Sequence, residues 1–229
     1  MALALLAGCG QTGQERVTFP IHGAGTGEAS FELDGWSVTL ERADVGFGPI
    51  YLCATQFADA DVCPQAEAEW LGAEAVDALD PSPAMLGDAQ AITETVRSAM
   101  FDYGRSWLLT ERAPRASEGA PEGRSAVMVL RAERGGERLE VRASVDVDPG
   151  AAGASAVIGA RTEPHAITGA EALTVRFDPA SWWRRVDLDR LAAEDDGDGV
   201  VELAPGDRAY DALVIGMTTD PVELEWTQP

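Results

Sequence analysis

The chain has 229 residues, of which 45% are hydrophobic, so it can bury a full core as one large domain or two small ones. It carries 39 acidic and 17 basic residues, a formal net charge of −22. Such a surface repels phosphate backbones, so we expect no nucleic-acid partner. All basic residues are arginine, and asparagine is absent too. The sequence therefore excludes lysine Schiff bases, the phosphate-loop lysine and N-glycosylation sequons.

The first nine residues form an apolar run that ends in small residues and a cysteine, as the end of a signal peptide does. The run is too short to span a bilayer, which needs about 20 apolar residues. Its last four residues, Leu6-Ala7-Gly8-Cys9, resemble the lipobox of bacterial lipoproteins. The resemblance implies that the Cys9 thiol is diacylated and that Cys9 becomes the first residue after cleavage. No basic residue precedes the run, so we expect the true start codon to lie upstream.

Two further features follow from this resemblance. The residue after the cysteine is Gly10 and not aspartate. By the same resemblance, this favours the outer membrane over the inner one. We therefore expect the protein in the cell envelope, anchored to the outer membrane and facing the periplasm. Residues 10–16 predict a short tether, and we expect residues 17–229 to form a single soluble domain. The alternative is a cytosolic protein whose first residues happen to be apolar.

The cysteine count agrees with export. Without Cys9, an even pair remains, Cys53 and Cys63, which we expect to form a structural disulfide in an oxidising compartment. A redox pair or a metal site is the alternative, but the usual spacings of those sites are tighter or include histidine.

The first half of the chain predicts strands and one helix. Val17 to Ile21 predicts a strand, which Gly23, Gly25 and Gly27 should interrupt. Alternating apolar residues on both sides of Asp34-Gly35 predict a hairpin, and Ile50 to Cys53 a buried strand. From Pro64 the apolar spacing changes to that of a helix of about four turns. Its apolar positions are Trp70, Ala73, Val76 and Leu79.

Ile92 to Leu109 then predicts a long or bulged strand with a turn at Tyr103-Gly104, and residues 112–125 predict a surface loop. A hairpin follows around Gly135-Gly136, with strictly alternating apolar residues up to Val147. We expect one face of this hairpin to be buried and the other to face water.

The last third predicts a strand from Leu173 to Phe177, a short helix after the Asp178-Pro179 cap, a helix near Gly206 and a closing strand from Val222 to Trp226. Several short strands with only two or three helices predict a mainly β fold. The expected architecture is an antiparallel sandwich or open barrel, with an α+β arrangement as the alternative.

Two sets of residues are candidate metal ligands. His22 and His165 are far apart in sequence, so only folding could bring them together around a transition metal. Glu194, Asp196 and Asp198 alternate as Ca²⁺ ligands do, but Pro205 stands where a calcium loop needs its bidentate acid. A solvated acidic turn is the simpler interpretation, and no other cofactor is indicated.

A contact surface is predicted at Trp182-Trp183-Arg184-Arg185, because four such side chains cannot all point inward. Gly35 to Leu40 and Phe177 to Trp183 resemble segments of uncharacterised lipoproteins from high-GC Gram-negative bacteria, a resemblance that implies no activity. No nucleophile elbow, phosphate loop or dinucleotide fingerprint is present, so an enzyme is unsupported.

The first hypothesis is therefore a non-enzymatic binding or assembly module with a protein or glycan partner, attached to the membrane through its N-terminal lipid. A lipoprotein that binds Ca²⁺ or a transition metal is the second. A hydrolase built on carboxylates is the third.

Overall fold

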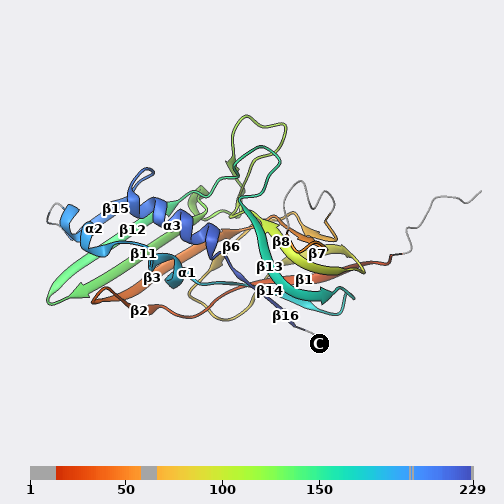
Figure 1. Ribbon diagram of the computed structural model, residues 1–229, viewed down its shortest axis with the longest axis horizontal. Helices are drawn as coiled ribbons and strands as arrows, with labels where there is room; N and C mark the ends of the chain where they lie inside the picture. Colours follow the sequence, from red (N-terminus) through yellow and green to blue (C-terminus); the bar gives the residue numbers. More distant parts are fainter. Residues whose placement is uncertain (1–13, 58–65, 196, 198, 228–229) are drawn as a thin grey trace, which may run out of the picture.

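The computed structural model describes residues 14–57, 66–195, 197 and 199–227. Two sheets lie end to end along the long axis, and the described helices cover one of them (Figure 1). The expected mainly β fold is confirmed. The expected antiparallel pattern holds with two exceptions, because β1 pairs with β14 and β12 with β15 in parallel.

An eight-stranded sheet forms one end of the molecule, in the order β13-β8-β4-β5-β7-β1-β14-β16. It curls until its edge strands β13 and β16 meet, since Trp226 Nε1 donates a hydrogen bond to Thr162 Oγ1 over 2.9 Å. The curled sheet therefore has the open-barrel form named among the expected alternatives. Its strands are β1 (Arg16–Gly25), β4 (Ile50–Cys53), β5 (Ala68–Trp70), β7 (Ala84–Ile92), β8 (Thr95–Phe101), β13 (Val157–Ala166), β14 (Ala172–Phe177) and β16 (Glu223–Thr227).

A six-stranded sheet forms the other end, with β15-β12-β11-β3-β2 in order and β6 also paired to β3. Both predicted hairpins lie here and are confirmed: Leu33 pairs with Trp36 across the first turn, and Arg134 with Glu137 across the second. Alternate residues of β11 and β12 are buried, so one face packs on the core and the other faces water, as predicted. The strands are β2 (Ser30–Leu33), β3 (Trp36–Phe47), β6 (Glu74–Asp77), β11 (Ala126–Arg134), β12 (Glu137–Val145) and β15 (Val200–Leu203).

The chain passes from the second sheet to the first at Gly48-Pro49, between β3 and β4. Gly48 has a φ of 102°, and a Cβ there would lie 2.3 Å from the carbonyl oxygen of Gly72. Only glycine tolerates both conditions, so the break between β3 and β4 at Gly48 has a steric cause. The break places β4 in register between β5 and β8.

Three helices are present among the described residues, α1 (Pro179–Trp183), α2 (Leu188–Glu194) and α3 (Arg208–Thr219). The predicted short helix after Asp178 and the helix near Gly206 are confirmed, and the Asp178 side chain accepts a hydrogen bond from the Ser181 N–H as a cap. The helices are tied to the sheets by buried polar contacts. For example, the Tyr103 hydroxyl donates to the Met217 carbonyl oxygen over 2.8 Å.

The predicted helix from Pro64 to Leu79 is wrong. The described part of this segment forms β5 and β6 instead. Ala68 and Trp70 are buried around exposed Glu69, and Val76 and Ala78 around exposed Asp77, so the segment also carries the period of two that a strand needs. Tertiary packing decides between the two periods, since Trp70 stacks on Phe47 with ring centroids 6.2 Å apart.

Two other predicted boundaries need correction. Gly23 and Gly25 do not interrupt β1 but lie inside it. A Cβ on Gly25 would lie 1.9 Å from the carbonyl oxygen of Ala78, so the glycine permits close packing of two backbone segments. The strand predicted from Ile92 to Leu109 is two strands, β8 and the short β9 (Arg105–Ser106), separated at the predicted turn.

A single continuous buried cluster connects the two sheets and the helices. Its largest members include Trp36, Trp182, Trp183, Tyr103 and Phe101. Among the described residues, no helix is both long and apolar enough to cross a membrane.

Candidate functional site

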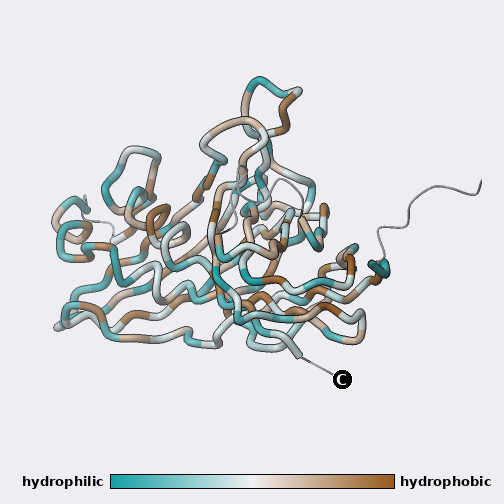
Figure 2. The backbone as a smooth tube through the Cα atoms, turned by 45° about the vertical axis from the view of Figure 1, so that its right-hand side comes forward, coloured by the Kyte–Doolittle hydropathy of each residue, from teal (hydrophilic) through white to brown (hydrophobic). Residues whose placement is uncertain are grey.

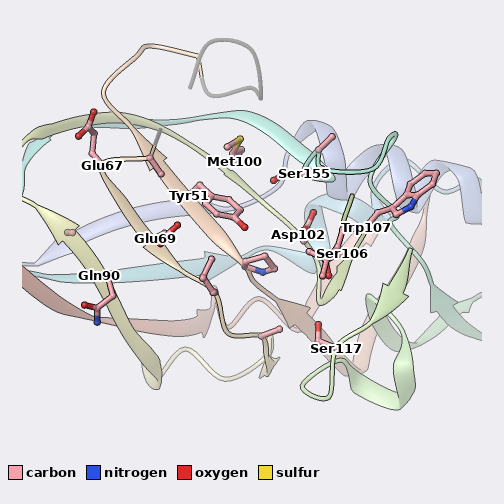
Figure 3. Close-up of a pocket in the computed structure, with 18 of the residues that line it drawn as sticks. Tyr51, Glu67, Glu69, Gln90, Met100, Asp102, Ser106, Trp107, Ser117 and Ser155 are labelled. Carbon is pink, nitrogen blue, oxygen red and sulfur yellow. The ribbon is translucent and has the colours of Figure 1, made fainter. Parts of the chain in front are cut away.

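A concavity with a volume of about 1100 Å³ lies on the outer face of the eight-stranded sheet (Figure 3). We call it the outer groove. Strands β4, β5, β7 and β8 form its floor, and the segments 105–117 and 153–155 form a wall. Among the described residues, the polar and aromatic ones that line the groove are Arg16, Tyr51, Glu67, Glu69, Gln90, Asp102, Ser106, Trp107, Arg115, Ser117 and Ser155.

Strand register aligns the floor. Met100 pairs with Tyr51, Tyr51 with Glu69, and Glu69 with Gln90, so four side chains form one row across four strands. Directly paired residues project from the same face of a sheet, and here that face is the outer one, because the neighbouring residue Leu52 is buried. The row therefore presents a thioether, a phenol, a carboxylate and an amide to the groove.

Two loops form the wall, and they are joined to each other. The Gly153 N–H donates to the Trp107 carbonyl oxygen over 2.7 Å, and a Cβ on Gly153 would lie 3.0 Å from the Leu109 side chain. Inside the segment 105–117, Glu111 accepts a hydrogen bond from the Leu108 N–H and forms an ion pair with Arg115 at 2.8 Å. The paired loops rise together beyond the sheets in both views (Figures 1 and 2).

The rim of the groove is apolar. Leu71 and Leu108 line it and are 63% and 52% exposed, and Leu109, on the same loop as Leu108, is 83% exposed. Figure 2 shows hydrophobic segments on the protruding loops. Large exposed aliphatic side chains beside a concavity are typical of a contact surface.

Asp102 is the most unusual ionisable group of the groove. It follows β8, its residue surface is only 3% exposed, and its Oδ1 accepts a hydrogen bond from the Ala156 N–H over 2.7 Å. Its backbone is fixed by two further bonds, since its N–H donates to the Pro49 carbonyl and its carbonyl accepts from the Gly48 N–H. Burial raises the pKa of the Asp102 carboxyl to about 7, although the Ala156 hydrogen bond opposes the rise.

Tyr51 lies between Asp102 and Glu69 (Figure 3). Burial raises the pKa of the Tyr51 phenol, and the charges of Asp102 and Glu69 raise it further. Directly before β5, burial and the charge of Glu94 raise the pKa of Glu67. The floor of the groove is thus a place where negative charge is poorly stabilised.

The predicted contact surface at Trp182 to Arg185 does not form as expected. Both Trp182 and Trp183 are completely buried, and Trp182 Nε1 donates to the Asp220 carbonyl oxygen. Arg184 and Arg185 remain at the surface, where Arg184 pairs with Glu28 at 3.0 Å and Arg185 with Asp220. Each tryptophan thus lies in the core, and the charged groups of the two arginines lie at the surface.

The two candidate histidines lie on strands that do not pair with each other. His22 lies on β1 beside Thr174, whereas the His165 ring on β13 stacks on Trp226 with centroids 4.1 Å apart. Burial lowers the pKa of His165. Glu194 ends α2 in an ion pair with Arg190. The described residues hold no group of three or more His, Cys, Asp or Glu that could bind a metal ion.

Four predicted site residues lie outside the described residues: Cys9, Cys63, Asp196 and Asp198. Cys53 is buried at the end of β4. The lipid anchor, the disulfide and the calcium loop therefore remain predictions.

Sequence reasoning missed the outer groove, because its floor comes from four strands that are distant in sequence. One local signal was available: Tyr51 breaks the apolar run of Ile50 to Cys53 and so marks the outward phase of that strand. Comparison with known proteins finds no matching family model, no similar curated protein and no similar solved structure.

Proposed function

We propose that this protein is a lipid-anchored protein of the cell envelope that binds an extended segment of a partner protein in the outer groove. The proposal has two independent supports. The lipobox-like Leu6-Ala7-Gly8-Cys9 supports the membrane anchor. The outer groove supports the binding function, and its row of side chains from Met100 to Gln90 is the observation that carries the proposal.

The shape and lining of the groove favour a peptide segment. The groove is open to solvent and crosses four strands, so it suits a chain that lies along it better than a small molecule enclosed on all sides. Both apolar side chains, such as Leu71 and Leu108, and hydrogen-bonding groups, such as Gln90 and Ser155, line it. A peptide offers both kinds of group, whereas a glycan offers few apolar ones.

The placement of the polar residues also fits a binding role. Glu69 and Gln90 are exposed on a sheet face, and neither forms a side-chain hydrogen bond or ion pair within the described part of the chain. By contrast, the outer face of the six-stranded sheet is covered by ion pairs such as Arg131–Glu41 and Arg142–Glu140. Unpaired polar side chains in a concavity are free to bind a partner without first breaking an internal contact.

Site-specific photo-crosslinking in the native cells tests the proposal. A photoreactive phenylalanine analogue replaces Gln90 in the groove or, as the matched control, Thr39 on the exposed face of β3. We expect a crosslinked partner segment from position 90 and not from position 39.

A second step identifies the segment as the ligand of the groove. Remade as a synthetic peptide, it should bind the wild-type chain and lose binding to Gln90→Trp, which fills the groove, but not to Thr39→Trp. Equal crosslinking at both positions, or binding that Gln90→Trp leaves intact, would contradict the proposal. Mass spectrometry of the mature N-terminus tests the anchor separately, since a diacylated Cys9 is required.

A hydrolase is the second candidate, and the single observation in its favour is the pKa of about 7 of Asp102. A carboxyl group that holds its proton near neutral pH can protonate a leaving group. In that case Asp102→Asn would abolish the release of product from a glycan or peptide that the groove binds. Binding without turnover would support the first proposal instead.

A further inference from the structure

The outer groove holds negative charge that the protein does not neutralise. Glu67, Glu69 and Asp102 line it, and none of the three forms an ion pair with any residue that the structure describes. The groove also contains Arg115, but its Nε is bound to Glu111 at 2.8 Å. Arg16 is the remaining cation, and it lies at the β1 end of the groove.

The groove is distinguished by having three carboxylates along one concavity without an arginine partner in the described part of the chain. Many exposed carboxylates have an arginine partner, as in Arg105–Asp148 at 2.6 Å and Arg176–Glu225 at 2.9 Å. With 17 arginines for 39 acids, a groove with unpaired carboxylates on its floor strongly attracts cations. A ligand that carries a cationic group would supply the missing positive charge.

We propose that the segment bound in the outer groove carries an arginine or lysine side chain, whose cationic group is held between Asp102 and Glu69 and against the ring of Tyr51. This inference rests on the proposed function and names the chemistry of its ligand. Carboxylates on two sides of an aromatic ring are a favourable environment for a guanidinium or ammonium group, which gains both ion pairs and a cation–π contact.

The neighbouring residues suit the rest of such a side chain. Met100 is next to Tyr51 in the floor row, and Pro49 lies before β4, so both offer apolar surface to the aliphatic stem of an arginine or lysine. A neutral sugar would leave the carboxylates uncompensated, and an acidic segment would be repelled. The charge and the apolar surface therefore favour the same class of ligand.

Proton release should accompany binding. Asp102 has a pKa of about 7, and a cation beside it favours the ionised form, so the affinity should rise between about pH 6 and pH 8. No nearby charge contributes to the raised pKa of Asp102, which follows from burial. The other ionisable groups that line the groove are Arg16, Tyr51, Glu67, Glu69 and Arg115.

Isothermal titration calorimetry with matched peptides tests the inference. The probe is a terminally blocked nonapeptide of valine and serine with one central arginine, and its control has citrulline, which has the same shape without the charge. At pH 8, we expect the arginine peptide to bind the full-length chain about tenfold more tightly, as one charged hydrogen-bonded contact allows. Glu69→Gln and Asp102→Asn should each remove most of this preference.

Glu133→Gln is the control variant, because Glu133 is an exposed acid on β11, far from the groove in the other sheet. It should leave both affinities unchanged. Equal affinity for the arginine and citrulline peptides, or no binding of either, would overturn the inference.

The test also separates this inference from the proposed function. If the arginine and citrulline peptides bind with equal affinity and Gln90→Trp abolishes the binding of both, the groove is a binding site and only its preference for a cation is refuted. Binding that Gln90→Trp does not weaken would refute the groove itself.

Discussion

The replacement Asp102→Asn should change how the stability of the protein depends on pH. Asparagine has nearly the same shape, and its Oδ1 can still accept the hydrogen bond that Asp102 receives from the Ala156 N–H. The substitution therefore removes the ionisation of Asp102 while keeping its packing and its hydrogen bond with Ala156.

The expected size follows from the pKa. In the unfolded chain the Asp102 carboxyl has its ordinary pKa of 3.8, and in the folded protein the pKa is about 7. Between these values the folded state binds more protons than the unfolded state, so the wild-type protein loses stability as pH rises through this window. One pKa unit corresponds to roughly 1.4 kcal/mol, so a difference of about three units changes the free energy of unfolding by about 4 kcal/mol.

Urea unfolding of both proteins from pH 4 to pH 8.5 measures the effect. The contributions of other groups, such as the raised pKa of Glu67, are common to both proteins and cancel in the difference. We expect Asp102→Asn to gain stability relative to wild type by up to about 4 kcal/mol between pH 4 and pH 8. A difference that stays constant across this range would refute the assigned burial of the carboxyl.

Two further predictions concern the core. Gly25→Ala should lower the free energy of unfolding by at least about 2 kcal/mol, because its Cβ would lie 1.9 Å from the Ala78 carbonyl oxygen. The control Gly150→Ala, whose Cβ would have no atom within 4 Å, should be nearly neutral in the same denaturation assay. Tyr103→Phe should lower the free energy of unfolding by about 1–2 kcal/mol, since it removes the buried hydroxyl that donates to the Met217 carbonyl. An unchanged melting temperature would contradict that role.

Much of the fold could be predicted from local chemistry. Asp34-Gly35 and Gly135-Gly136 adopt positive φ, as a tight hairpin requires, and the alternation on either side fixes the register. Asp178 caps its helix as expected, because the sequence supplies the cap and a first-turn proline together. In each case the determining residues are close in sequence.

The sequence predictions were wrong where contacts between residues distant in sequence determine the structure. The helix predicted around Trp70 fails because the ring packs against Phe47, 23 residues earlier in the chain, and that contact requires a strand. Trp182 and Trp183 were expected in part at the surface, but the core extends under α1 and buries both. The local pattern alone does not decide either outcome.

The outer groove could not be predicted for the same reason. Tyr51, Glu69 and Gln90 become neighbours only through the pairing of β4, β5 and β7. The burial of Asp102 depends on the segment near Ala156, which is 54 residues away. A sequence rich in acids contains many carboxylates, and only the fold shows which of them is buried beside others.

The most direct test of the account is the location of the bound ligand. Backbone amide chemical shifts of the isotopically labelled chain, followed during titration with the arginine peptide, map it residue by residue. The account predicts that the largest changes fall at Tyr51, Glu69, Gln90 and Asp102. Changes confined to the six-stranded sheet, or at the surface of Arg184 and Arg185, would contradict it.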